Sequence, residues 1–374
     1  MAVHRTPLDD SGPASAPASG RTTTLAGSWR LGLIAATLIP PLALAGCSGS
    51  ASDDATAPAR LTVISHDSFV LSDDLKAQFA AQTGLDVAYV APGNAGAVVN
   101  QLILTRDSPL GDVVFGIDNT FAGRAIDESV LSPYVSAALP AGVDNLAADD
   151  LGSLTPIDFG DVCLNADDAW FAGHDLALPK TLDDLLKPEY ANLLVVTNPA
   201  SSSPGLAFLA ATVAAKGDPG YLDFWRALKA NGVKVDAGWS DAYNVDFSGS
   251  AGHGAYPLVL SYASSPAYEV GDDGLPRTSA LSATCFRQVE YAGVIAGAAN
   301  PAGAREFIDF LLSDAVQSQI PDSMYMSPVS PTATVPADWA RFTSVVTDPW
   351  SLPAATISRD REGWIKSWTA AVLG

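Results

Sequence analysis

Residues 61–115 read LTVISHDSFVLSDDLKAQFAAQTGLDVAYVAPGNAGAVVNQLILTRDSPLGDVVF and decide the fold. Three short apolar runs in this stretch have the length of buried strands: 61–64, 85–90 and 112–115. The segments between them carry apolar residues at helical spacing, and Ser72 and Gly84 suit the start and the end of the first helix. This β-α-β-α-β order predicts a mostly parallel sheet.

A second set of strands and helices follows the segment 154–160, which we interpret as the crossover between the two sets. Further strands are predicted at 193–196, 233–235 and 258–260. Further helices are predicted at 205–216, 221–229 and 301–312, and another helix starts at Thr181–Asp184 and ends before Pro188. The chain is therefore expected to be an α/β protein with two sheet-based halves.

Polar or aromatic residues follow the carboxyl ends of these predicted strands. They are His66, Asp67, Asn94, Asp118, Ser202, Ser203, Trp239 and Tyr262. In open α/β sheets, ligands bind at that edge, and two such edges facing each other would form a cleft. The alternative is that these residues form ordinary turns, which are polar for backbone reasons.

The composition excludes some classes of function. The chain has 374 residues, with Lys+Arg 20 against Asp+Glu 41 and a net charge of -21, whereas nucleic-acid binders need a basic surplus. A hydrophobic content of 48% is not that of a disordered chain. No G-x-S-x-G, Walker A or G-x-G-x-x-G pattern is present, so neither catalysis nor a nucleotide cofactor is indicated.

The first 46 residues have the layout of a secretory signal. An apolar run at 31–45 follows Arg21 and Arg30 and is too short for a comfortable membrane span. It ends in Leu-Ala-Gly-Cys at 44–47, which resembles a bacterial lipobox and predicts lipidation of Cys47. Residues 47–59 are then a flexible tether. We expect the protein to be anchored by its lipid to the outer face of the cytoplasmic membrane.

Cys163 and Cys285 are the cysteines that remain after Cys47. An exported protein permits a disulfide between them. They can equally be two small buried hydrophobic residues. No CxxC pair is present, so no metal site is predicted.

The side chains near the strand ends suit an organic cation. Trp239, Tyr262, Tyr268 and Tyr325 lie in loops rich in Ser, Gly and Pro, and aromatic faces attract cations. Asp67, Asp118 and Asp241 can balance a positive charge. The alternatives are aromatic rings packed in the core and aspartates that form turns. Serines 201–203 open an apolar helix, where they can bind an anion such as phosphate or simply cap the helix.

Several motifs, in order along residues 61–374, resemble those of the thiamine-binding periplasmic proteins, which are the substrate-binding subunits of bacterial ABC importers. The motifs are LTVISHDSF (61–69), DVVFGIDN (112–119), NPASSSPGLA (198–207), GWSDAYNVDF (238–247), LVLSYASSPAYE (258–269) and WIKSWTAAV (364–372). The resemblance implies a hinged, two-lobed periplasmic-binding-protein fold of type II with the ligand between the lobes. Lobe I would comprise 60–155 and about 286–330, and lobe II 156–285 and about 331–374.

The resemblance also implies a function and a set of binding residues. The protein would bind thiamine or thiamine phosphate, without any cofactor or metal, and deliver it as a monomer to a permease coupled to an ATPase. Matching positions place the ligand against Trp239, Tyr262, Ala263, Ser264, Ser265 and Tyr268, and place its phosphate end at Ser202 and Ser203. Asn94 and Ala95 stand where the family more often has Asp-Gly near the aminopyrimidine. His66 stands where a tyrosine is usual, and Ala200 where some members have arginine.

Three alternatives remain open at this stage. A related protein of this kind can bind a polyamine or ferric iron, although a ferric site uses adjacent tyrosines and Tyr262 is followed by Ala263. A protein of a different class, an exported hydrolase, would show turnover of ester or phosphate substrates.

Overall fold

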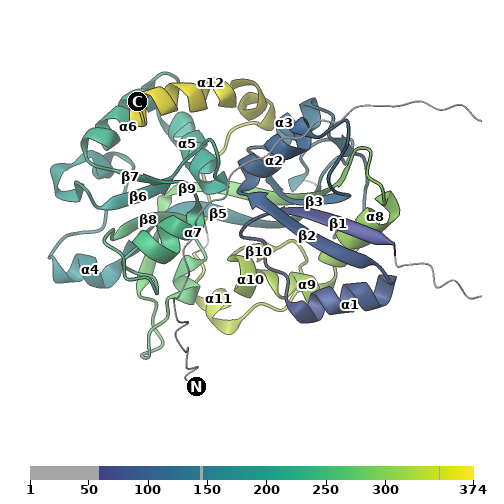
Figure 1. The fold of residues 1–374 in the computed structure, drawn as a ribbon. Helices are drawn as coiled ribbons and strands as arrows, with labels where there is room; N and C mark the ends of the chain where they lie inside the picture. Colours follow the sequence, from purple (N-terminus) through teal and green to yellow (C-terminus); the bar gives the residue numbers. More distant parts are fainter. Residues whose placement is uncertain (1–58, 144–145, 345) are drawn as a thin grey trace, which may run out of the picture. The chain divides into compact units, whose positions relative to one another are not determined.

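The computed structural model describes residues 59–143, 146–344 and 346–374 (Figure 1). The strands are β1 Arg60–His66, β2 Asp86–Gly93, β3 Val113–Asp118, β4 Leu131–Ser132, β5 Thr155–Asp167, β6 Leu194–Thr197, β7 Lys234–Asp236, β8 Leu258–Tyr262, β9 Thr278–Ile295 and β10 Ser327–Pro328. The predicted signal and Cys47 lie outside the described residues.

Helices surround these strands. The α-helices are α1 Asp73–Thr83, α2 Ala95–Leu104, α3 Ala122–Asp127, α4 Asp168–Gly173, α5 Ser203–Lys216, α6 Gly220–Ala230, α7 Trp239–Asp241, α8 Pro301–Leu311, α9 Asp314–Gln317, α10 Ile320–Met324, α11 Ala337–Phe342 and α12 Ala354–Val372. Shorter helical turns are η2 Asp183–Leu186, η3 Pro188–Tyr190, η4 Ala242–Asp246 and η5 Ser265–Tyr268.

The strands pair in the order β2-β1-β3-β9-β5-β8-β6-β7. At one end of this order β1 is parallel to both β2 and β3, and at the other end β6 is parallel to both β7 and β8. The long strands β5 and β9 are antiparallel to each other and connect the two parallel groups. The two predicted sets of parallel strands are therefore confirmed, but β5 and β9 join them into one continuous sheet instead of two separate sheets.

Local signals identified five of the helices in the described residues, namely α1, α2, α5, α6 and α8, but not the long C-terminal helix α12. The Ser72 hydroxyl accepts a hydrogen bond from the Leu75 amide at the start of α1. Gly84 ends that helix with a φ of 69°, a left-handed conformation that favours glycine. The helices expected at 205–216, 221–229 and 301–312 are confirmed as α5, α6 and α8.

The segment interpreted as the crossover, residues 154–160, lies almost wholly in the 13-residue strand β5, which does connect the two parallel groups. The helix predicted from Thr181 differs in the structure. The segment after Thr181 forms only short 3-10 turns, η2 and η3. The Asp184 carboxylate accepts hydrogen bonds from the Lys180 and Thr181 amides at 2.9 Å each, which favours a tight local turn, and Pro188 follows too soon for a longer helix.

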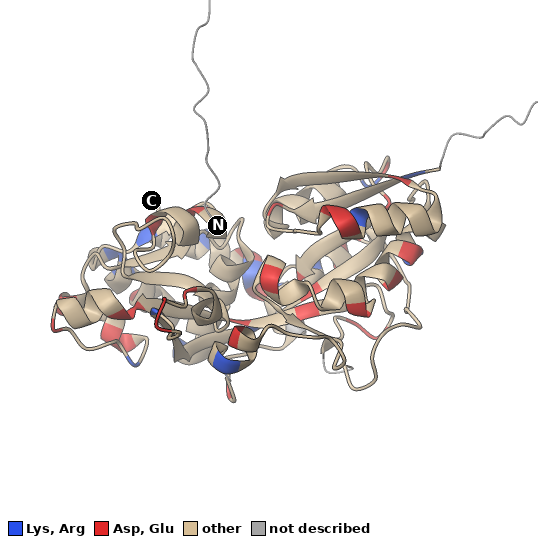
Figure 2. Ribbon diagram, turned by 90° about the horizontal axis from the view of Figure 1, so that it is seen from below, with Lys and Arg blue, Asp and Glu red and all other residues tan. Residues whose placement is uncertain are grey.

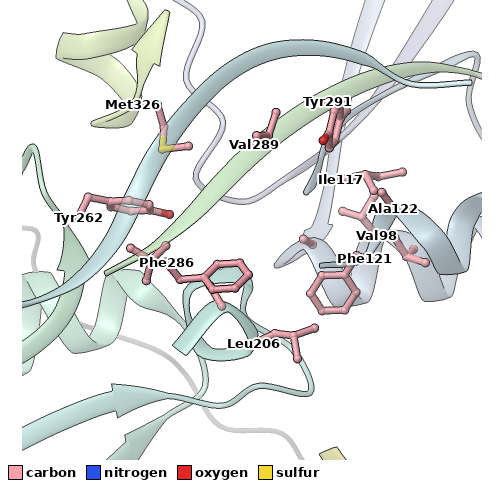
Figure 3. Packing of buried hydrophobic residues seen from close by; sticks show 14 of the residues in the cluster. Val98, Ile117, Phe121, Ala122, Leu206, Tyr262, Phe286, Val289, Tyr291 and Met326 are labelled. Atoms are coloured by element: carbon pink, nitrogen blue, oxygen red, sulfur yellow. The ribbon is translucent and has the colours of Figure 1, made fainter. Parts of the chain in front are cut away.

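The core is continuous across the junction between the two groups of strands. Figure 3 shows buried side chains from α2, β3, α3, α5 and β9 in one cluster: Val98, Ile117, Ala122, Leu206, Phe286, Val289 and Tyr291. Helix α5 is buried along most of its length, which explains why its sequence is apolar on all sides. Within the described ranges, no helix combines the length and the apolarity that crossing a membrane requires.

Cys163 on β5 and Cys285 on β9 form a disulfide, with their Cα atoms 4.2 Å apart. The bond links cysteines separated by 122 positions along the chain. Both residues are fully buried and pack against Ala263. The disulfide therefore ties together the two strands that join the parallel groups.

Replacing both cysteines by alanine should lower the free energy of unfolding by about 2–4 kcal/mol, because the bond restricts a long loop of the unfolded chain. Urea unfolding of the oxidised protein and of the double variant measures this difference. Reduced wild-type protein serves as the control and should unfold near the midpoint of the variant. Equal midpoints for oxidised and reduced protein would show that the bond adds no stability.

Candidate functional site

A cavity of about 230 Å³ lies where the carboxyl ends of β1, β2 and β8 meet the first residues of α5 and α7. Its lining consists of His66, Asp67, Ser68, Val70, Asn94, Ala95, Ser203, Pro204, Trp239, Ser240, Tyr262, Glu290, Ser323, Met324 and Tyr325. Residues from both parallel groups of strands contribute. Strand ends that are far apart in the sequence thus converge on one space, as the α/β pattern predicts.

Three aromatic rings form one wall of this cavity: Trp239, Tyr262 and Tyr325. The centroid of the Trp239 ring lies 5.5 Å from that of Tyr325 and 6.3 Å from that of Tyr262. On another side, Trp239 stacks on Tyr243 at 5.0 Å with an interplanar angle of 14°. The indole is thereby held in a fixed orientation while it still borders the cavity.

Buried serines position these rings. The Trp239 Nε1 donates to Ser261 Oγ at 2.9 Å, and Ser261 Oγ in turn lies 2.8 Å from Ser265 Oγ. Ser264 Oγ donates to the carbonyl oxygen of Tyr325. Tyr325 has a φ of 61°, which is unusual for a residue with a side chain, and this hydrogen bond helps to fix that backbone conformation.

Ala263 and Tyr268, which the resemblance also predicted, do not line the cavity but pack near the residues of the aromatic wall. Ala263 packs against the disulfide. The Tyr268 ring lies 4.1 Å from the Tyr325 ring, and its hydroxyl donates to the Pro321 carbonyl oxygen. The structure thus brings eight of the predicted residues to the cavity lining: His66, Asp67, Asn94, Ala95, Ser203, Trp239, Tyr262 and Tyr325. Six others lie outside that lining: Asp118, Ser202, Ala263, Ser264, Ser265 and Tyr268.

Glu290 on β9 borders the cavity and was missed from the sequence. Its Oε1 accepts a hydrogen bond from Gln288 Nε2 at 2.9 Å, and its Oε2 lies 3.3 Å from His66 Nε2. The sequence does contain a signal for Glu290, because it is a single acidic residue within an apolar run. It could not be used, because the strand β9 was not predicted. The lining residues Ser68, Val70, Pro204, Ser240, Ser323 and Met324 were missed as well, and nothing in their sequence context marks them.

His66 takes a defined tautomer in this site. The Ser68 amide donates to Nδ1 at 3.1 Å, so the neutral ring carries its proton on Nε2 and donates it to Glu290. Burial lowers the pKa of His66, but Glu290, Asp67 and Asp118 outweigh burial and the pKa is raised above 6.5. Gly116, with a φ of 86°, makes room for the ring, because a Cβ at that position would lie 1.9 Å from His66 Cδ2.

Two further carboxyl groups are buried next to this pair. Burial raises the pKa of Asp118, while hydrogen bonds from Ser203 and Thr120 act to lower it. Burial, and then the negative charge of Glu290, raise the pKa of Asp158 well above its usual range. Neither oxygen of Asp158 has a hydrogen-bond partner among the described residues. Burial without a hydrogen-bond partner therefore favours the protonated form of Asp158 more than in an exposed aspartate.

Among the described lining residues, His66, with its raised pKa, is the basic side chain, and it is paired with Glu290. Asp67 and Glu290 border the cavity, whereas no Lys or Arg does so in the part of the chain that the structure describes. Acidic residues also lie on many helices and loops elsewhere, with fewer basic residues among them (Figure 2). No cluster of three or more His, Cys, Asp and Glu that could hold a metal ion is found within residues 59–143, 146–344 and 346–374. The site is suited to an aromatic or organic cation.

Comparison with known proteins agrees with this geometry. The profile of a family described as bacterial extracellular solute-binding protein matches residues 108–347. The thiamine-binding periplasmic protein of Escherichia coli (strain K12) is 28% identical over 322 residues, which is 83% of this chain and 93% of that protein. The protein of the same name from Brucella abortus biovar 1 is 28% identical over 327 residues, covering 85% and 93%.

Solved structures give the same result. One described as a periplasmic thiamin binding protein superimposes with a TM-score of 0.73 and 26% identity, over 87% of this chain and 99% of that one. A ferric binding protein from Campylobacter jejuni has a TM-score of 0.66 over 83% and 99%, but at 16% identity it shares only the fold. These matches confirm the resemblance found in the motifs and the two-lobed periplasmic-binding-protein fold.

The pairing of His66 with Glu290 is testable by NMR titration of the histidine resonances. The pKa of His66 should lie above 6.5 in the wild-type protein and should be lower in Glu290→Gln, because the variant removes the carboxylate that raises this pKa most while burial continues to lower it. The variant His66→Gln identifies the resonance by its loss. An unchanged pKa in Glu290→Gln would contradict the pairing.

Proposed function

Because the chain belongs to the bacterial extracellular solute-binding protein family, we propose that it binds thiamine outside the cytoplasm and delivers it to the permease of an ABC importer. One observation carries this proposal. Three aromatic rings and two carboxylates surround a single cavity whose described lining contains no Lys or Arg.

The chemistry of thiamine matches this lining. Thiamine consists of an aminopyrimidine joined to a thiazolium ring that carries a permanent positive charge. The face of a Trp or Tyr ring attracts such a cation by about 0.5–2 kcal/mol, with the larger value when water is excluded. Glu290 and Asp67 supply the opposite charge, and the Asn94 side chain can hydrogen-bond to the aminopyrimidine. The names of the relatives from Escherichia coli and Brucella abortus support the same ligand.

The proposed mechanism is capture and delivery, without a catalytic step. We assign residues 60–155 and about 286–330 to lobe I, and residues 156–285 and about 331–374 to lobe II. Strands β5 and β9 connect the two and would act as the hinge. The lobes would close on the ligand, and a permease would bind the closed form and open it when its ATPase hydrolyses ATP.

We also propose that the protein is located outside the cytoplasm and is anchored to the membrane by a lipid. The Leu-Ala-Gly-Cys sequence at 44–47 supports lipidation of Cys47 and attachment to the outer face of the cytoplasmic membrane. The tether 47–59 would let the folded part reach a permease in the same membrane. Residues 60–374 are expected to act as a monomer.

Thiamine should bind with submicromolar affinity and quench tryptophan fluorescence. Trp239→Ala should weaken binding by more than about 1 kcal/mol, because it removes a ring that borders the cavity. Isothermal titration calorimetry measures the affinity of both proteins. Trp350→Ala is the matched control, since Trp350 is exposed and lies outside the cavity lining, and its affinity should equal that of the wild type.

Absence of both heat and thermal shift with thiamine would refute the proposed function. Spermidine and ferric citrate, titrated in the same way, separate it from the polyamine and iron alternatives. If either binds more tightly than thiamine, that alternative replaces the proposal. Turnover of an ester or phosphate substrate would instead favour a hydrolase.

Closure of the lobes predicts a change in molecular dimensions. Addition of saturating thiamine should decrease the radius of gyration measured by small-angle X-ray scattering, because the two lobes approach each other. Trp239→Ala at the same thiamine concentration should show a smaller decrease. Identical scattering with and without bound thiamine would argue against ligand-driven closure.

A further inference from the structure

We propose that thiamine competes with a proton in this cavity: thiamine binding expels the proton that makes His66 an imidazolium, and His66 in its charged form weakens thiamine binding. This inference rests on the proposed function and adds the control of binding by pH. It concerns three residues that border the cavity, namely His66, Ser68 and Glu290.

The His66 ring is held beside Glu290 at the cavity. Its Nε2 lies 3.3 Å from Glu290 Oε2, and His66 and Glu290 are only 9% and 5% exposed. The Phe115 ring lies 5.5 Å from the His66 ring. On another side the ring lies against Gly116, where even a Cβ would come within 1.9 Å of Cδ2. The imidazole therefore has little room to swing away, and a charge on it stays at the cavity.

The Ser68 amide links the protonation of this ring to the shape of the cavity. It donates a hydrogen bond to His66 Nδ1 at 3.1 Å, which requires a lone pair on that nitrogen. The proton that creates an imidazolium occupies Nδ1, so two N–H groups would point at each other. Since Ser68 belongs to the lining, protonation of His66 displaces a lining residue as well as adding a positive charge.

Glu290 is the shared counter-ion in this competition. It pairs with His66, and Asp67 is the other carboxylate among the described lining residues. An imidazolium and a thiazolium beside the same carboxylate repel each other, so each disfavours the presence of the other. When thiamine binds, the imidazolium loses its Nδ1 proton to solvent water, and the neutral ring keeps its hydrogen bond from Nε2 to Glu290. Thiamine keeps its charge throughout.

Nearby carboxylates make the charged form of His66 accessible in the absence of ligand. Burial lowers the pKa of His66, but Glu290, Asp67 and Asp118 outweigh burial and raise it above 6.5. These carboxylates come from β9, from the residue after β1 and from β3, so several strands direct negative charge at the ring. Within the described residues, no Lys or Arg in the lining opposes them. A bound thiazolium is therefore the cation that shifts His66 to its neutral form.

Two other titratable groups lie close to Glu290. Burial, and then the charge of Glu290, raise the pKa of Asp158 on β5 well above its usual range, so Asp158 is a rival source of the released proton. Burial also raises the pKa of Tyr262 on β8 well above its usual range, so its phenol stays neutral. An experiment must therefore distinguish His66 from Asp158.

NMR titration of ¹³C-labelled histidines measures the exchange directly. The pKa of His66 should be at least about one pH unit lower in the thiamine-saturated protein, equivalent to about tenfold weaker thiamine binding when His66 is charged. His174 and His253 are exposed and lie outside the lining, so their titration curves should be the same with and without thiamine. The resonance of His66 is the one missing from His66→Gln. If that variant does not fold, single replacements of the other histidines identify it by elimination.

Calorimetry in two buffers of different ionisation enthalpy counts the protons released between about pH 6 and 8. Thiamine should release part of one proton from the wild type and from Asp158→Asn, but none from His66→Gln. Release that persists in His66→Gln, or a His66 pKa that thiamine leaves unchanged, overturns the inference while thiamine binding stands. Absence of thiamine binding at every pH overturns both this inference and the proposed function.

Discussion

Removing a carboxylate from water costs several kcal/mol unless hydrogen bonds or an opposite charge replace the lost hydration. In this protein Asp118, Asp158 and Glu290 are buried close to one cavity. The loss of hydration is offset in a different way for each of the three side chains. Asp118 receives three hydrogen bonds, and Glu290 contacts Gln288 and His66. Asp158 has no hydrogen-bond partner among the described residues, and burial raises its pKa. The result is a cavity that two carboxylates border and that no Lys or Arg borders among the described residues. A cation with flat rings is the ligand that such a lining favours.

The fold supplies this arrangement through β5 and β9. Glu290 and Gln288 lie on β9, and Asp158 lies on β5, so the acidic side chains are fixed on the two strands that connect the parallel groups. The aromatic residues come from the start of α7 (Trp239), the end of β8 (Tyr262) and the residue that follows α10 (Tyr325). A movement of the two parallel groups of strands relative to each other would therefore change the distance between the aromatic wall and the carboxylates. In this way the binding site and the proposed hinge share the same strands.

The sequence predicted the parts of the fold that depend on local patterns. Short apolar runs, the Ser72 cap and the Gly84 terminator identify β1, α1 and β2 because neighbouring residues suffice to determine them. Strands β5 and β9 could not be found in this way, since their polar residues are stabilised by pairing across more than 100 positions. Glu290 was missed for the same reason. Motif resemblance found Ser264, Ser265 and Tyr268, but it cannot distinguish side chains that line a cavity from those that hold the lining in place.

A crystal structure of the protein with thiamine tests the central claim most directly. The account predicts the thiazolium ring within about 6 Å of an aromatic ring centroid in the wall formed by Trp239, Tyr262 and Tyr325. It also predicts that Glu290 or Asp67 faces the ligand and that no Lys or Arg contacts it. Thiamine bound outside this cavity, or within it but away from all three rings, would contradict the account.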